Sequence, residues 1–312
     1  MMRALSILSC LHVAAAFSST ASSSDIAITR SYTLHGNGID SSCILNEVRP
    51  APRDPNMEED DVELYYPTTR RAFMFPNHPP NKLLEIRQTS FGCGRLGATV
   101  WPSAIALACL LASDDSNSLI KGKRVMELGS GCGLPSLVAK EICSSQDILA
   151  TDYWEENMDG PGDRLVPKDL FGVNLAYNIG SDATSSVQHL DWHDEMGTLK
   201  VASDFRPDVI IGSDLVYYPM DTPPLLQTLE ILLKAGGAKD ALLISPLRPA
   251  YSEREALPEF RSLLENGALG DGCEVTMDEF EMVGMGINGD EETHKFLRIQ
   301  VHSHDERSHN DS

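Results

Sequence analysis

The sequence lacks the cysteine and histidine spacings that mark common metal sites. None of its seven cysteines forms a C-x-x-C pair, and no H-E-x-x-H motif occurs, so we expect no metal cofactor. Several cysteines stand in apolar runs and are interpreted as small, mostly buried hydrophobic residues. The sequence also lacks an apolar run as long as a membrane span, so we expect the mature protein to be soluble and to have no membrane partner.

Basic residues are scarce. The chain has 25 lysines and arginines against 46 aspartates and glutamates, which gives a net charge of −21 and a pI near 4.7. Such a surface repels phosphate backbones, so we expect no nucleic-acid partner. A basic or neutral partner suits this charge better, although acidity is more often a solubility feature.

The N-terminus has the composition of a targeting segment. In residues 1–17 one arginine precedes an apolar stretch that ends in small alanines, which predicts a signal cleaved near Ala16. The serine-rich stretch after it makes residues 1–24 resemble the two-part plastid presequence of algae with complex plastids. The alternatives are a secretory signal and a start site placed too far upstream. We therefore expect a plastid or secretory route, or a cytoplasmic protein if the signal is not used.

Residues 25–80 show no sustained hydrophobic period. Seven prolines interrupt the pattern between positions 50 and 80, and residues 58–61 form an acidic run. We predict a partly ordered N-terminal extension here and no second domain. At the other end of the chain we expect a disordered tail over residues 303–312.

From Trp101 onward, short apolar runs alternate with helical patterns. Helices are predicted at 102–112, 135–143, 169–178, 224–234 and 253–266, and strands at 124–128, 148–151, 187–190, 208–213 and 241–245. This alternation predicts a doubly wound, Rossmann-like parallel sheet with helices on both faces. Two further strands, 275–280 and 296–301, have no helix between them, which predicts one antiparallel strand near the edge. Ligands bind such sheets beyond the carboxyl ends of the strands.

A glycine loop follows the first of these strands. The run ELGSGCGL occupies residues 127–134, and its glycines let the backbone turn sharply and approach a ligand closely. The dinucleotide pattern G-x-G-x-x-G would need glycine at position 134, where leucine stands, so no diphosphate is implied. Glu127 is an acid at the end of a buried strand, and a cationic, amino-acid-bearing ligand would explain it.

Acids and aromatics follow the next three strands. Asp152 ends the second strand, where a carboxylate can bind a ribose diol, although an isolated aspartate there is more often a cap or turn residue. Asp191 and Trp192 follow the third strand, and the tryptophan could stack on an adenine ring. Residues 213–219, SDLVYYP, follow the fourth strand and place one acid and two aromatics above the sheet.

Together these motifs resemble the seven-β-strand methyltransferases, and within them the lysine-methyltransferase branch called methyltransferase family 16. Residues 97–104, GATVWPSA, and 174–178, NLAYN, resemble the same branch. The resemblance covers residues 81–302 and implies a domain with a seven-stranded, mostly parallel sheet and one antiparallel strand. It implies an S-adenosylmethionine-dependent N-methyltransferase that acts on a lysine of a protein substrate. The donor contacts that it implies come from Trp101, Gly129, Ser130, Gly131, Asp152, Trp192 and Ser213, to which Glu127 is added from its position.

Asp214 and Tyr217 are the expected catalytic residues. A lysine amine has a free pKa of about 10.4 and must lose a proton before it attacks the methyl group. Asp214 can orient this amine and accept its proton, and Tyr217 can offer a hydrogen bond or a π face to a cation. For Tyr217 the alternative is simple packing at the strand end.

Other functions remain open from the sequence. A small-molecule methyltransferase fits the same motifs, and the segment 154–168, which resembles an insertion, leaves the substrate class undecided. A nicotinamide-dependent oxidoreductase fits less well because of Leu134 and because no clear Tyr-x-x-x-Lys motif is present. A methyltransferase-like binding module is a third alternative, and we expect a monomer.

Overall fold

The computed structural model describes residues 27–39, 44–50, 68–76, 78, 82–89, 96–113, 118–154, 167–179, 185–247 and 256–304. Three predicted segments lie wholly or mostly outside these residues: the presequence 1–24, the segment 154–168 and the tail 303–312. No helix in the described part of the chain is long and apolar enough to cross a membrane.

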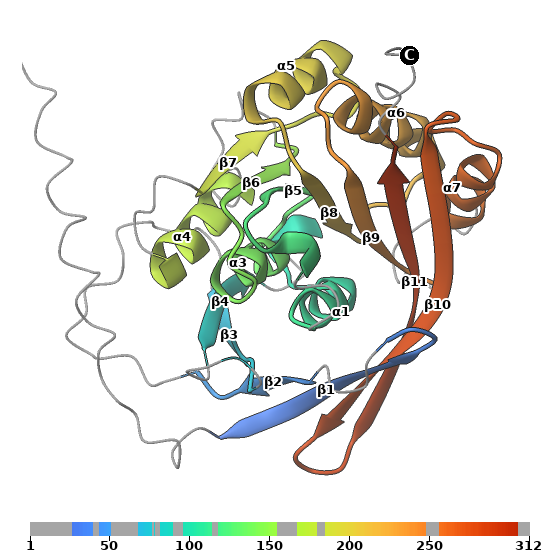
Figure 1. Ribbon diagram of the computed structural model, residues 1–312. Helices are drawn as coiled ribbons and strands as arrows, with labels where there is room; N and C mark the ends of the chain where they lie inside the picture. The colour runs from blue at the N-terminus through green and yellow to red at the C-terminus, as the bar shows by residue number, and fades with distance from the viewer. Residues whose placement is uncertain are drawn as a thin grey trace, which may run out of the picture.

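One mixed sheet organises the fold (Figure 1). Its strands lie in the order β4-β3-β2-β1-β10-β11-β9-β8-β5-β6-β7. The five parallel strands are β5 (Arg124–Leu128), β6 (Asp147–Asp152), β7 (Ser185–His189), β8 (Val209–Ser213) and β9 (Asp240–Pro246). β11 (Glu291–Ser303) runs antiparallel to β9, and β10 (Cys273–Gly286) runs antiparallel to β11. The predicted Rossmann-like arrangement is therefore present, with β11 as its antiparallel strand.

The sheet is larger than the resemblance implied. Four strands precede the parallel part: β1 (Ile28–Gly36), β2 (Ile44–Val48), β3 (Thr68–Met74) and β4 (Leu83–Thr89). They form an antiparallel meander that joins the sheet through pairing of β1 with β10. The expectation of seven strands is not confirmed, because the described part of the chain forms eleven. Nor is that sheet mostly parallel, because six of its ten strand pairings are antiparallel.

The four added strands fall partly in the segment expected to be a partly ordered extension. The prolines that interrupt the pattern there lie outside β1, β2 and β3. β1 buries Tyr32 and Leu34 on one face while its other positions are more exposed, which is the two-residue period of a half-buried strand.

Helices fill the inside of the curved sheet and cover its outside. α1 (Pro102–Leu111) and α3 (Leu134–Glu141) lie between the parallel strands and the meander, in one continuous core (Figure 1). Eight residues of α1 are buried, as expected for a helix that is apolar on all sides. α5 (Glu195–Phe205), α6 (Thr222–Lys234) and α7 (Ala256–Glu265) pack on the other face. α4 (Pro167–Ile179) packs against both β4 and β7, the two edge strands.

Candidate functional site

The glycine loop connects β5 to α3 in a conformation that favours glycine. Gly129, Gly131 and Gly133 have φ values of 60°, 50° and 78°. A Cβ on Gly131 would lie 2.9 Å from the carbonyl oxygen of Gly97, and a Cβ on Gly133 would overlap the ring of Phe171. Both the left-handed backbone and the close packing therefore require glycine at this turn.

Glu127 lies at the end of β5 and is 1% exposed. Its Oε2 accepts hydrogen bonds from the backbone N of Ser136, at 3.0 Å, and from the Ser136 hydroxyl, both in the first turn of α3. Its Oε1 has no partner, and neither has the buried Oγ of Ser130 in the loop. Burial raises the pKa of Glu127 to about 8, although the bonds from Ser136 oppose the shift. An acid without a full set of partners therefore lies next to the glycine loop.

Asp152 ends β6 with its carboxylate against the same loop. Its Oδ2 accepts a hydrogen bond from the backbone N of Gly131 at 2.7 Å, and its Oδ1 accepts one from the backbone N of Tyr153 at 2.8 Å. Burial raises its pKa to about 6, against the effect of these bonds. Each carboxylate oxygen can accept a second hydrogen bond, so both keep capacity for a ligand.

Asp214 follows β8 in a left-handed conformation, with φ of 58°. Its backbone N donates to the carbonyl of Ile244 on β9, and its Oδ2 accepts a hydrogen bond from Ser103 Oγ at 3.1 Å. Burial raises its pKa, and the Ser103 bond works in the opposite direction. The side chain is thus fixed between the end of β8 and the first turn of α1.

Tyr217 lies close enough to Asp152 and Asp214 for their charges to affect its pKa. Burial raises its pKa to about 12, with contributions from the charges of Asp152, Asp221 and Asp214. Its ring meets the ring of Tyr218 edge to face, with 5.0 Å between centroids. The structure therefore brings Tyr217, Asp214 and Asp152 to one end of the sheet.

The remaining predicted residues take different positions. Ser213 is the last residue of β8. Trp192 follows β7 and packs, half-buried, against the core beneath α5 and α6. Trp101 stands just before α1, and its Nε1 donates to the carbonyl of Leu96 at 2.8 Å. All three residues lie next to the strands and the helix that the sequence predicted for them. The two tryptophans, however, already make contacts within the protein: Trp101 with the carbonyl of Leu96 and Trp192 with the core.

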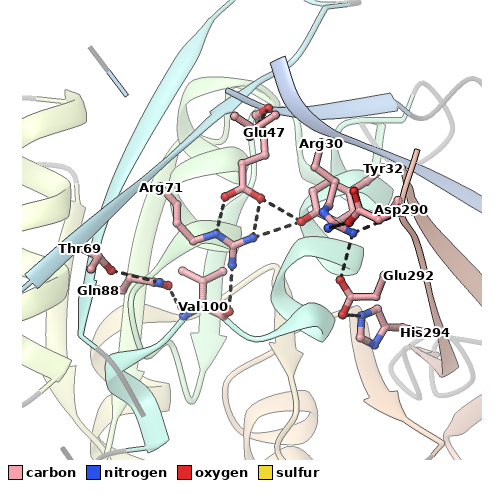
Figure 2. A network of polar contacts seen from close by, with 12 residues as sticks. Arg30, Tyr32, Glu47, Thr69, Arg71, Gln88, Val100, Asp290, Glu292 and His294 are labelled. Atoms are coloured by element: carbon pink, nitrogen blue, oxygen red, sulfur yellow. Dashed lines mark hydrogen bonds and ion pairs between the residues drawn. The ribbon is translucent and has the colours of Figure 1, made fainter. Parts of the chain in front are cut away.

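The residue before Trp101 is held by the meander, which the sequence did not predict. Arg71 donates to the carbonyl of Val100 at 3.3 Å, and Gln88 Oε1 accepts from the Val100 backbone N at 3.0 Å (Figure 2). Arg71 also makes two 2.8 Å bonds to Glu47. Burial would raise the pKa of Glu47, but Arg71 outweighs it and lowers that pKa. The network therefore holds both backbone polar groups of Val100, at the point where the chain enters α1.

α4 fastens the glycine loop to β4. The side-chain amide of Asn174 donates to the carbonyls of Cys132, at 2.9 Å, and of Arg87, while its oxygen accepts from the Arg87 backbone N at 2.7 Å. Asn178, one turn later, bonds the backbone N and carbonyl of Glu85 in the same way. The run NLAYN is therefore a structural support of the loop. Among the described residues no cluster of His, Cys, Asp and Glu could hold a metal ion.

Comparisons with known proteins identify the family of the chain. The model of a family described as lysine methyltransferase matches residues 79–255. Protein N-terminal and lysine N-methyltransferase EFM7 of Candida glabrata is 30% identical over 234 residues, which cover 73% of this chain and 84% of the relative. The protein of the same name in Candida albicans is 29% identical, over 56% of this chain and 66% of the relative. Protein N-lysine methyltransferase METTL21A of Danio rerio is 32% identical, over 51% of this chain and 66% of the relative. The last two alignments span just under two thirds of the relatives' lengths.

Proposed function

Because the chain belongs to the lysine methyltransferase family, we propose that it transfers a methyl group to a lysine side chain of a protein substrate at the carboxyl ends of β5, β6 and β8. Its methyl donor is S-adenosylmethionine. The observation that carries the proposal is the convergence of the glycine loop, the buried Glu127 and Asp152 at one turn, with Asp214 and Tyr217 beside them.

The residues at the loop fit this donor. The unpartnered Oε1 of Glu127 and Oγ of Ser130 suit the charged amino-acid end of the molecule. Asp152 suits its ribose, and Gly129 and Gly131 offer backbone without side chains. Trp101, Trp192 and Ser213 are proposed to complete the pocket around the adenine and the sulfur. When bound, the donor supplies a methyl group on a positively charged sulfur.

The chain's own residues then have to position and deprotonate the amine. Asp214 is held by Ser103 and is proposed to orient the lysine amine through its carboxylate. Its raised pKa makes it a better proton acceptor than an ordinary aspartate, although a carboxylate also favours the charged amine. Tyr217 keeps its hydroxyl proton at neutral pH because its pKa is about 12, so it can donate a hydrogen bond or present its ring to the amine.

A labelling experiment tests the proposal. The purified protein and donor with a labelled methyl group are added to a cell lysate, and the labelled species are identified by mass spectrometry. Label on lysine side chains of proteins supports the proposal, provided that the Asp214→Asn variant gives far less. The names of two relatives also include N-terminal methylation, so label confined to protein N-termini would change the nucleophile. Label found only in small molecules would overturn the protein substrate.

A further inference from the structure

We propose that the four side chains Tyr153, Met196, Tyr218 and Met220, called here the docking rim, bind a protein segment in which apolar and basic residues flank the target lysine. The inference rests on the proposed function and specifies its substrate class. A protein that must recognise a segment around one lysine needs contact area beyond the pocket that holds the amine.

These four side chains make up most of the exposed large hydrophobic residues in the described part of the chain. Met196 and Met220 are 72% and 74% exposed, Tyr153 is 54% exposed and Tyr218 is 40% exposed. In the described part of the chain only three other large hydrophobic residues are exposed, and these lie along β1 and at the β10–β11 turn. Exposed apolar side chains that gather at one place mark interaction surfaces, whereas single ones need no explanation.

The docking rim is formed by residues that follow the strands of the proposed site in the chain. Tyr153 directly follows Asp152, and its ring packs 5.5 Å from that of His189. Tyr218 packs against Tyr217. Met196 lies in the first turn of α5, and Met220 lies in the 3-10 helix η5 (Pro219–Asp221). The 3.1 Å contact between His193 and Asp221 joins the two segments. The apolar side chains therefore come from the loops after β6, β7 and β8, where the substrate must approach.

The described segments of these loops are acidic, and their charge favours a basic occupant. Segments 152–154, 191–196 and 213–221 contain no lysine or arginine and one histidine. Their six carboxylates belong to Asp152, Asp191, Asp194, Glu195, Asp214 and Asp221. This field attracts a basic segment, and it opposes a second copy of this chain, whose net charge is −21. Methionine is flexible and polarisable, so Met196 and Met220 can adapt to apolar residues of different shapes.

Peptide binding and peptide methylation, measured separately, test the inference. Fluorescently labelled peptides carry one central lysine flanked by leucine and arginine, by glycine and serine, or by leucine and glutamate. Binding to the full chain is followed by anisotropy with the demethylated product of the donor present, and methylation of the same peptides is followed by mass spectrometry. The variants are Met196→Gln/Met220→Gln and, as a matched control, Met285→Gln, which changes an exposed methionine of β10 away from the site.

We expect the leucine–arginine peptide to bind at least about tenfold more tightly than the other two, since two partly buried apolar contacts and the charge each contribute. The double variant should lose about tenfold in affinity for this peptide and keep the affinity for the donor product, while Met285→Gln should match the wild type. Added salt should weaken the binding. Equal or absent binding of the three peptides, or equal losses in both variants, would overturn the docking rim. Selective binding without methylation of the lysine would instead overturn the proposed function.

Discussion

Replacement of Glu127 by glutamine tests the link between the buried acid and the methyl donor. The carboxyl group has a pKa of about 8, so at pH 7 about 0.9 of the molecules carry a proton on it. We propose that the ammonium group of the donor favours the charged carboxylate. Binding at pH 7 should then release up to about 0.9 proton from this residue, and at pH 9 only about 0.1. Donor affinity should fall by up to about tenfold per pH unit below that pKa.

Calorimetry measures this proton directly. Titrations of donor into protein at pH 7, in two buffers with different heats of ionisation, give the number of protons released. The amine of the donor titrates in the same range, and Glu127→Gln keeps that contribution while removing the one from the carboxyl group. The difference between the two proteins is therefore the quantity of interest. The same release in wild type and variant would refute the assignment of Glu127 as a partner of the donor.

The same residue predicts how stability depends on pH. The pKa of Glu127 is higher in the folded chain than its ordinary value of 4.5, so the folded state binds the proton more tightly. Its contribution to stability is complete below pH of about 4.5 and is lost as the pH rises through about 8. Thermal unfolding of wild type and Glu127→Gln across this range should show a steeper loss in the wild type. Parallel curves would mean that the carboxyl group does not titrate in this way.

Three further changes address catalysis and the frame around the site. Asp214→Asn should lower turnover by roughly 10²-fold and leave the dissociation constant of the donor within a few-fold, as rate and calorimetric measurements will show; a large loss of donor affinity at unchanged rate would make Asp214 a donor ligand. Gly133→Ala should cost about 2 kcal/mol more in urea unfolding than Gly122→Ala, because both have positive φ but only the Cβ at 133 overlaps a neighbour; equal losses would contradict the packing argument. Arg71→Met should cost about 2–3 kcal/mol by leaving a half-buried carboxylate without its cation, with only the Tyr32 hydroxyl as partner, and Arg71→Met/Glu47→Gln should recover part of it; no recovery would assign the loss to packing.

The sequence predicted the parallel half of the fold because its signals are local. Each of β5, β6, β8 and β9 is a short apolar run buried on both faces, and the helices between them are long enough to show their own period. Asp152 and Asp214 stand directly at the ends of such runs, so their positions at the site follow from the strands alone.

The other half depends on partners far along the chain. The meander strands pair with one another and with β10, far along the chain, and β4 is completed by α4, whose Asn174 is 87 residues from its partner Arg87. α5 was not predicted because it buries only Thr198, Val201 and Ala202, which is too narrow an apolar face to stand out. Ser103 gave no signal of its own, since its role appears only when α1 comes to rest beside the end of β8. The hydrogen bond from Arg71 to Val100 likewise forms only when β3 has joined the sheet.

The attachment of α4 to β4 also bears on self-association. A sheet border can recruit a strand from another molecule only if its backbone N–H and C=O groups are available. At β4 the backbone N–H and C=O groups of Glu85 and Arg87 already form hydrogen bonds with Asn178 and Asn174. Side chains of α4 therefore occupy the bonding positions that a neighbouring strand would use. Because Asn174 also holds the carbonyl of Cys132 in the glycine loop, an incoming strand would have to pull that support away. Strand addition at this border would therefore remove a hydrogen bond that supports the glycine loop.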